Sequence, residues 1–105
     1  MTAVEATSHR LGPVDEVPVG EGRSFAVAGE QVAVFRLRDG GLRATQAACP
    51  HAGGPLADGQ TDAAKVVCPL HGYGFSLADG ACVNGGFAVR VFTVREEAGE
   101  LVVEV

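Results

Sequence analysis

The sequence predicts an all-β fold, a small sandwich or partly open barrel, because apolar and polar residues alternate along most of the chain and turn signals recur at short intervals. Hydrophobic residues occupy 47% of the 105 positions, so a modest core can form. Fifteen glycines in a chain of this apolar content indicate tight turns rather than disorder. The length suffices for a single domain, which we expect to span residues 1–105.

The expected strands form two groups. In the first half of the chain they cover residues 24–28, 31–38 and 42–47, with turns at Gly29-Glu30 and Asp39-Gly40-Gly41. In the second half they cover residues 74–77, 81–83, 89–95 and 101–105, with turns at Asp79-Gly80, Asn84-Gly85-Gly86 and Ala98-Gly99. No segment keeps a helical period over the length of an ordinary helix. The sequence therefore predicts a meander of short strands.

Residues 47–76 differ in character from the two strand groups. They contain three of the five prolines, two of the three cysteines and two of the three histidines. Binding residues concentrate in loops that a rigid scaffold positions. We therefore expect this segment to be an insert that carries the functional site.

Two short motifs of the insert carry the candidate metal ligands Cys49, His51, Cys68 and His71. Each motif supplies one thiolate and one imidazole, which is the ligand set of a Rieske centre, a [2Fe–2S] cluster with two Cys on one iron and two His on the other. A zinc ion accepts the same ligands and is the alternative, although zinc fingers usually pair Cys with Cys and His with His. Cys82, the third cysteine, is expected to be a small buried residue in a strand.

Glycine and proline flank these candidate ligands. Gly53, Gly54, Gly72 and Gly74 lack Cβ atoms, so the backbone can approach bridging sulfides closely enough for its N–H groups to donate to them. A proline follows each of the two cysteines and stiffens its loop. Both features favour a cluster whose geometry changes little when an electron arrives.

The two motifs resemble the cluster-binding loops of the Rieske family. The segments AVFRLRDGGLRATQAACPH (33–51), CPHAGGPLADG (49–59) and VVCPLHGYGFSLADG (66–80) are similar to the small subunit of the assimilatory NAD(P)H nitrite reductase. The resemblance implies a β-sandwich base with a small cluster-binding subdomain. It also implies a one-electron carrier that serves a large subunit bearing flavin, an iron–sulfur cluster and sirohaem. Ferredoxins of ring-hydroxylating dioxygenases are similar too, and they make a reductase or an oxygenase the alternative partner.

Four positions depart from the respiratory members of that family. Those members carry a disulfide between the loops at the positions of Gly54 and Leu70, so this clamp is missing here. They place Ser and Tyr, which donate hydrogen bonds to sulfur, where this chain has Tyr73 and Phe75. Fewer donors stabilise the reduced cluster less, which predicts a potential near the low end of the Rieske range.

Charge and hydropathy exclude several function classes. The net charge is −5 and the eight Lys and Arg residues are dispersed, so we expect no nucleic-acid partner. No apolar run reaches the length of a membrane span, and the first residues lack the pattern of a signal peptide, which together predict a cytoplasmic protein. Nothing supplies an open iron position or an acid–base pair, so we expect no catalysis by this chain alone. A non-redox assembly module, stabilised by a cluster or a zinc ion, remains the alternative from another class.

Overall fold

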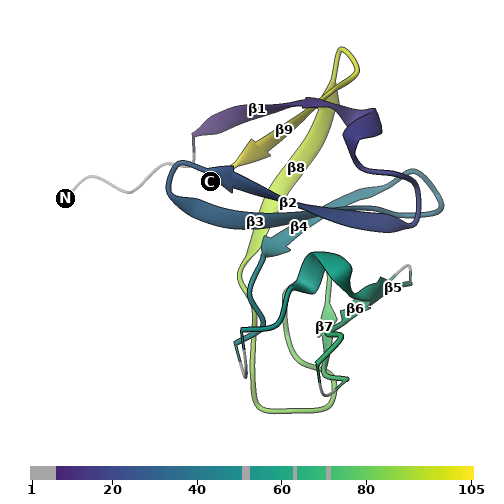
Figure 1. Ribbon diagram of the computed structural model, residues 1–105, viewed down its shortest axis with the longest axis vertical. Coiled ribbons are helices and arrows are strands. Elements are labelled where there is room, and N and C mark those ends of the chain that lie inside the picture. The colour runs from purple at the N-terminus through teal and green to yellow at the C-terminus, as the bar shows by residue number, and fades with distance from the viewer. Residues whose placement is uncertain (1–6, 51–52, 63, 71) are drawn as a thin grey trace.

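The computed structural model describes residues 7–50, 53–62, 64–70 and 72–105 (Figure 1). The larger sheet contains β1 (Ser8–Pro13), β2 (Glu21–Val27), β3 (Glu30–Arg36), β4 (Leu42–Gln46), β8 (Val91–Glu97) and β9 (Glu100–Glu104). The smaller sheet contains β5 (Gln60–Thr61), β6 (Lys65–Val67) and β7 (Gly74–Ser76). Two short 3₁₀ turns, η1 (Val14–Glu16) and η2 (Leu56–Asp58), complete the described elements.

All neighbouring strands are antiparallel. The order is β1-β9-β8-β4-β3-β2 in the larger sheet, which curls into half a barrel, and β5-β6-β7 in the smaller sheet. Figure 1 shows the smaller sheet beside one end of the curled sheet, together with the loops that flank it. This architecture confirms the predicted all-β fold. Neither helical turn in the described segments has the length and apolarity that a membrane crossing requires.

Strand β3 is buried on both faces and separates two apolar cores. Val32 and Val34 point into the core inside the curled sheet, which also contains Leu101 and Val103. Ala33 and Phe35 point to the other side, into the core shared with η2 and the smaller sheet. Because side chains alternate along a strand, four consecutive buried residues are the signature of a strand covered on both sides.

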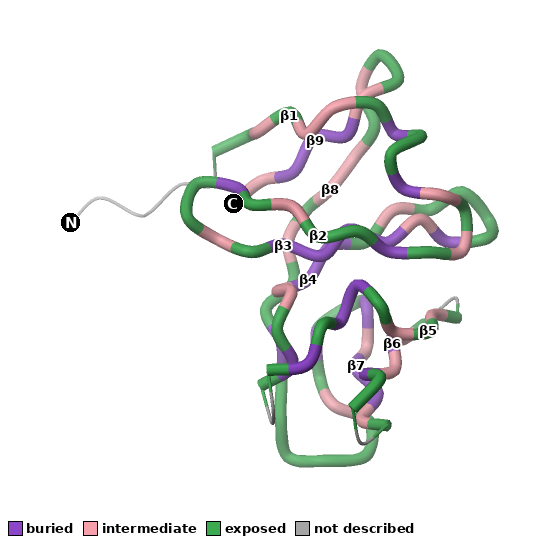
Figure 2. Tube along the Cα trace, viewed as in Figure 1, coloured by how far each residue is buried: buried purple, intermediate pink, exposed green. Residues whose placement is uncertain are grey.

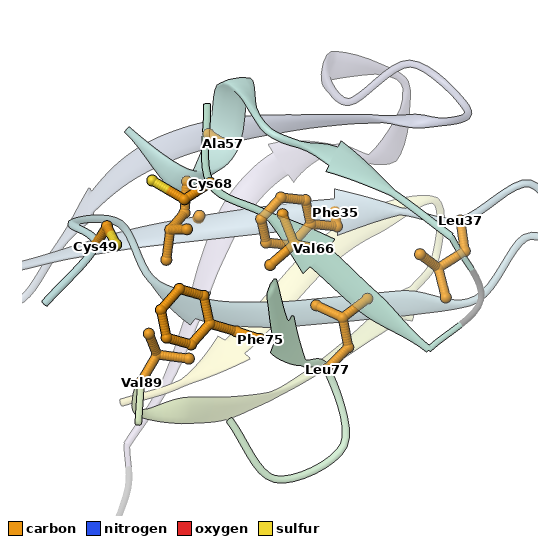
Figure 3. Packing of buried hydrophobic residues seen from close by; sticks show 11 residues of the cluster. Phe35, Leu37, Cys49, Ala57, Val66, Cys68, Phe75, Leu77 and Val89 are labelled. Carbon is orange, nitrogen blue, oxygen red and sulfur yellow. The ribbon is translucent and has the colours of Figure 1, made fainter. Parts of the chain in front are cut away.

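The second core joins the base to the smaller sheet. Phe35 lies in it with Val66 of β6 and Phe75 of β7, and all three side chains are fully buried (Figure 3). A Cβ atom at Gly22 of β2 would lie 2.7 Å from the Phe35 ring and 2.8 Å from the carbonyl oxygen of Ala57. Glycine at position 22 thus lets η2 and the Phe35 ring approach β2.

Several expected boundaries differ from the observed ones. The sequence predicts a strand at 81–83, but Ala81 and Cys82 form only isolated bridges, to Ala88 and Phe75 respectively. The sequence pattern does not delimit β1, β5 or β6, and the last two strands are only two and three residues long. Strands this short carry too few residues for a period-two pattern to be recognised. The remaining expected strands are present within a few residues of their predicted ends.

Two hairpins use alanine where the backbone favours other residues. The loops Ala28-Gly29 and Ala98-Gly99 have φ values of 51° and 82°, and of 53° and 80°. Two positive φ values in a two-residue loop define a type I′ turn, for which Asn-Gly is the preferred pair. Alanine is strained in this region because its Cβ crowds the backbone.

We therefore expect Ala98→Asn to stabilise the fold by about 0.5–1 kcal/mol, because asparagine tolerates the left-handed region better than alanine. The measurement is the thermal midpoint of the holoprotein. Ala78→Asn is the matched control, since Ala78 is also an exposed turn residue but is not one of the two alanines with positive φ. A midpoint that rises equally in both variants would show that turn geometry is not the cause.

Candidate metal centre

Two loops that share a closing hydrogen bond and the position of a glycine carry the predicted ligands. Residues 49–54 lie in the connection between β4 and η2, and residues 68–73 connect β6 to β7. The backbone N–H of Cys49 donates to the carbonyl oxygen of Gly54, and that of Cys68 donates to Tyr73, both at 2.8 Å. Each loop is thus closed by a bond from its cysteine to the residue five positions later.

The same position of each loop requires glycine. Gly53 and Gly72 both lie four residues after the cysteine and have φ values of 71° and 72°. A Cβ atom at either glycine would meet nothing within 4 Å, so the backbone conformation, and not lack of space, demands glycine there. The two loops therefore repeat one design although their sequences differ.

The thiols of both loops are buried in one apolar core. Cys49 and Cys68 are each 1% exposed and belong to the core that contains Phe75 and Val89. Figure 3 shows both cysteines at the same end of that core. All three cysteines of the chain are thiols rather than halves of a disulfide.

The first loop lies directly against the second. A Cβ atom built at Gly54 would be 3.0 Å from the Sγ atom of Cys68 and 3.0 Å from the Cδ1 atom of Leu70. The positions that carry a disulfide in the respiratory family members are therefore neighbours in space, and the Leu70 side chain contacts Gly54 where a second sulfur would lie. Because Gly54 has no Cβ atom, there is room beside the buried Cys68 thiol.

A third loop, residues 82–87, holds the second loop in place. The side-chain oxygen of Asn84 accepts a hydrogen bond from the N–H of Gly74 at 3.0 Å, and its nitrogen donates to the carbonyl oxygen of Gly72 at 3.3 Å. Tyr73, between these two glycines, stacks edge-to-face on Phe87 with 5.1 Å between ring centroids. From the sequence alone, Asn84 is predicted only as a turn residue, since Asn-Gly is a common turn signal.

The chain's remaining cysteine is placed differently from expectation. Cys82 is half-buried in an isolated bridge with Phe75, rather than buried in a strand. Its thiol donates to the side-chain oxygen of Asn84 at 3.5 Å. Cys82 therefore supports the third loop.

Two charged residues, Asp62 and Lys65, precede the second loop at the connection between β5 and β6. The carboxylate of Asp62 accepts hydrogen bonds from the N–H groups of Ala64 and Lys65, at 2.8 and 2.9 Å, and pairs with the Lys65 ammonium at 2.5 Å. The hydrogen bond from the Lys65 side chain, with those backbone donors, lowers the pKa of Asp62 to about 2. This exposed network orders the start of β6, which leads into Cys68.

The four predicted ligands divide into two pairs. The structure brings Cys49 and Cys68 together as buried thiols of equivalent loops. His51 and His71 lie outside the described residues, so their part of the predicted ligand set stays a prediction. Among the residues that are described, no group of three or more His, Cys, Asp or Glu side chains could hold a metal ion.

The sequence profile of the Rieske [2Fe–2S] domain matches residues 7–95, which is most of the chain. The chain belongs to the Rieske family. Its cofactor is accordingly a Rieske-type [2Fe–2S] cluster, a carrier of single electrons. The geometry fits this cofactor, because the paired loops bury two cysteines in one core and a Rieske cluster requires two cysteine ligands.

Solved Rieske proteins share the whole fold. A Mycobacterium tuberculosis protein designated an NADH-dependent nitrite reductase small subunit superimposes with a TM-score of 0.88 at 28% identity, over 95% of this chain and 96% of its own. The ferredoxin of carbazole 1,9a-dioxygenase from Nocardioides aromaticivorans superimposes with a TM-score of 0.82 at 30% identity, over 92% of this chain and 96% of its own. Both confirm the predicted Rieske fold.

Curated relatives are much longer than this chain. The oxygenase component of 3-ketosteroid-9-alpha-monooxygenase from Mycolicibacterium smegmatis is 35% identical over 82 residues, which are 78% of this chain and 21% of that protein. The chain spans about a fifth of the length of the curated relatives it matches. The similarity therefore concerns their Rieske segment.

We expect Gly54→Ala to lower the iron and sulfide content of the purified protein. The added Cβ would crowd the Cys68 thiol and Leu70, and overpacking of this kind costs about 1–3 kcal/mol. Gly86→Ala is the control, because a Cβ there meets nothing within 4 Å and its φ is not positive. Unchanged iron content and an unchanged spectrum in Gly54→Ala would contradict the close approach of the two loops in the loaded protein.

Proposed function

We propose that Cys49, His51, Cys68 and His71 hold the cluster, and that this Rieske protein carries electrons as the small subunit of an NAD(P)H-dependent nitrite reductase in the cytoplasm. The equivalence of the two closed loops is the observation that supports the ligand set. Each loop presents a buried thiol after a closing backbone bond, and each sequence places one histidine two or three residues after that cysteine. A loop pair of this design supplies one thiolate and one imidazole from each side.

The chain's own residues keep the site rigid. Proline follows each cysteine, and Asn84 holds the second loop at Gly72 and Gly74. Rigid loops keep the ligands in nearly one geometry in both oxidation states, so little reorganisation accompanies electron transfer. When bound, a Rieske cluster accepts and releases one electron at a time.

The buried side chain of Phe75, beside the second loop, supports a low reduction potential of the cluster. Phe75 is fully buried in the core that contains Cys49 and Cys68, and its hydrocarbon ring cannot donate to a sulfide. Hydrogen bonds to sulfur raise the potential of such clusters, and a position without a donor leaves it lower. A low potential suits a carrier that exchanges electrons with a flavin reduced by NAD(P)H.

Similarity over the full length of the nitrite reductase small subunit supports the choice of partner. The proposed partner is a large subunit with flavin, an iron–sulfur cluster and sirohaem, on which nitrite is reduced. The carbazole dioxygenase ferredoxin, similar over nearly as much of the chain, favours a second candidate function as the ferredoxin of a ring-hydroxylating dioxygenase. In that case the partners are a reductase and an oxygenase.

The ligand set is tested by electron paramagnetic resonance of anaerobically purified protein before and after dithionite. We expect a Rieske signal on reduction that Cys49→Ser and Cys68→Ser abolish. His51→Cys and His71→Cys should replace it with the signal of a more cysteine-rich cluster and lower the potential by about 100 mV or more. Cys82→Ser is the matched control and should keep the wild-type signal.

A colourless protein that holds zinc even after iron–sulfur reconstitution would overturn the electron-carrier proposal and favour a metal-stabilised module. A wild-type signal in the Cys49→Ser or Cys68→Ser variant would overturn the ligand assignment alone.

The partner is tested with a purified flavin and sirohaem nitrite reductase subunit. We expect the holoprotein to co-purify with it and to increase NADH-dependent nitrite reduction several-fold, whereas the Cys68→Ser variant should give no increase. Activity only alongside the reductase and oxygenase of a ring-hydroxylating dioxygenase would reverse the choice between the two candidate functions.

A further inference from the structure

The only asparagine of the chain, Asn84, is followed by glycine in an exposed loop. Residues 83–88 are all exposed, and Figure 2 shows the loops around β7 as a largely exposed end of the molecule, away from the curled sheet. In an Asn-Gly pair the backbone nitrogen of the second residue reaches the side chain of the first easily, because glycine has no Cβ to hinder the approach. Asn84-Gly85 therefore has the sequence and the exposure of a deamidation site.

The contacts of Asn84 with the second loop require both ends of its amide. The oxygen accepts hydrogen bonds from the N–H of Gly74 at 3.0 Å and from the thiol of Cys82 at 3.5 Å. The nitrogen donates to the carbonyl oxygen of Gly72 at 3.3 Å. A carboxylate only accepts hydrogen bonds. Aspartate at this position would therefore lose the bond to Gly72 and place a negative oxygen against that carbonyl.

A negative charge at position 84 would also lack a counter-charge among the neighbouring segments. Segments 49–57, 66–78 and 80–89 contain none of the eight Lys and Arg residues. Arg90, the next cation along the chain, pairs with Glu30 at 2.9 Å. Hydration by solvent is then the favourable state of the exposed carboxylate, which draws the side chain at position 84 away from the second loop.

The second product of deamidation, isoaspartate, would alter the backbone as well. Its main chain runs through the side-chain carbon, which adds one methylene between residues 84 and 85. Gly85 already packs against the second loop, since a Cβ there would lie 2.8 Å from the ring of Tyr73. A longer backbone at this point pushes against Tyr73. Both products thus disturb the same loop.

An amide that holds the first loop is protected from the same reaction. The Nε2 atom of Gln46 donates to the carbonyl oxygen of Ala48 at 2.7 Å, and its Oε1 atom accepts from the N–H of Arg90 at 2.8 Å. Gln46 is followed by Ala47, and its longer side chain would have to close a larger, less favoured ring. Pairing with Val32 at the end of β4 also fixes its backbone. The two cysteine loops therefore differ in chemical durability.

We propose that Asn84 is a modification site, at which spontaneous deamidation releases the second cysteine loop and limits the working life of the metal centre. The Gly85 nitrogen loses its proton and attacks the Cγ atom of Asn84, and ammonia leaves. Water then opens the resulting succinimide to aspartate or isoaspartate, so water is the only co-reactant and no electron is exchanged. This inference rests on the ligand set proposed above, which places two ligands on the second loop.

The hydrogen bonds of Asn84 set the rate of the reaction. Its side chain reacts only while it is free of Gly72 and Gly74, and these two bonds keep it bound for most of the time. Their combined strength predicts deamidation about 5–30-fold slower than in a free peptide. The fold thus delays the modification without preventing it.

The first test follows the holoprotein and a synthetic peptide of residues 80–90 during incubation at mildly alkaline pH. Peptide mapping by mass spectrometry measures conversion of amide to acid at Asn84, with Gln46 as the internal control. We expect Asn84 to convert about 5–30-fold more slowly than the peptide, and Gln46 to stay intact. Asn84 that persists far beyond this time, or that converts as fast as the peptide, would overturn the proposal.

The second test measures what the modification does to the metal centre. Anion exchange separates modified chains, which carry one additional negative charge, from unmodified chains of the same incubated sample. We expect the modified chains to lose iron to a chelator at least about five-fold faster, because a hydrogen bond that holds the second loop is gone. Equal iron loss from the two fractions would overturn the proposal.

Two variants check the cause of the faster iron loss. Asn84→Asp supplies the aspartate product directly and should lose iron as the modified chains do. Gln31→Glu makes the same change of amide to acid on an exposed residue of β3 and should behave as the wild type. Equal acceleration in both variants would assign the effect to net charge and overturn the proposal.

These outcomes separate the inference from the proposed function. If reduced, unmodified protein gives no Rieske signal but the modified chains lose bound zinc faster, the electron-carrier proposal fails and the modification site is supported. If the Rieske signal is present and equally durable in both fractions, the inference fails and the electron-carrier proposal stands.

Discussion

Burial of β3 on both faces is the constraint on which the rest of the structure depends. One face of the strand completes the core of the curled sheet through Val32 and Val34. The other face, through Ala33 and Phe35, packs against η2 and the smaller sheet. Because interiors are close-packed, a shift of Phe35 would displace the elements that carry both cysteine loops. The base thus determines where the thiols lie, although it contributes none of the predicted ligands.

Rigidity of the metal centre comes from many weak restraints instead of one covalent link. Respiratory relatives lock their loops with a disulfide, and the chain has Gly54 and Leu70 in contact at those positions. Here each loop is closed by its own backbone hydrogen bond, and the second is also held by Asn84. Each bond contributes about 1 kcal/mol. Their sum holds the loops without a covalent link between them.

The sequence predicted the all-β class and most long strands, because their period-two pattern and turn residues are local signals. It also predicted Cys49 and Cys68 as ligands, and the structure buries both cysteines in the same core. It could not show that Asn84 clamps the second loop, since residues ten and twelve positions away contribute that contact. The brief strands β5 and β6 were missed for a related reason. The pairing of β5 with β6 depends on packing in the core that contains Val66, and no residue pattern within the two strands signals it.

The distribution of charge opposes association between copies of the chain. Exposed apolar side chains such as Leu70, Val83 and Phe87 favour association, and on an uncharged protein they would favour aggregation as well. The Lys, Arg, Asp and Glu residues that give the net charge of −5 all lie outside segments 49–57, 66–78 and 80–89, and some of them form ion pairs on the strands, such as Arg10 with Glu100. Copies of the chain, each with this net negative charge, therefore repel one another. The separation of charge from the end that carries the cysteine loops thus leaves apolar contacts as the main interactions available there.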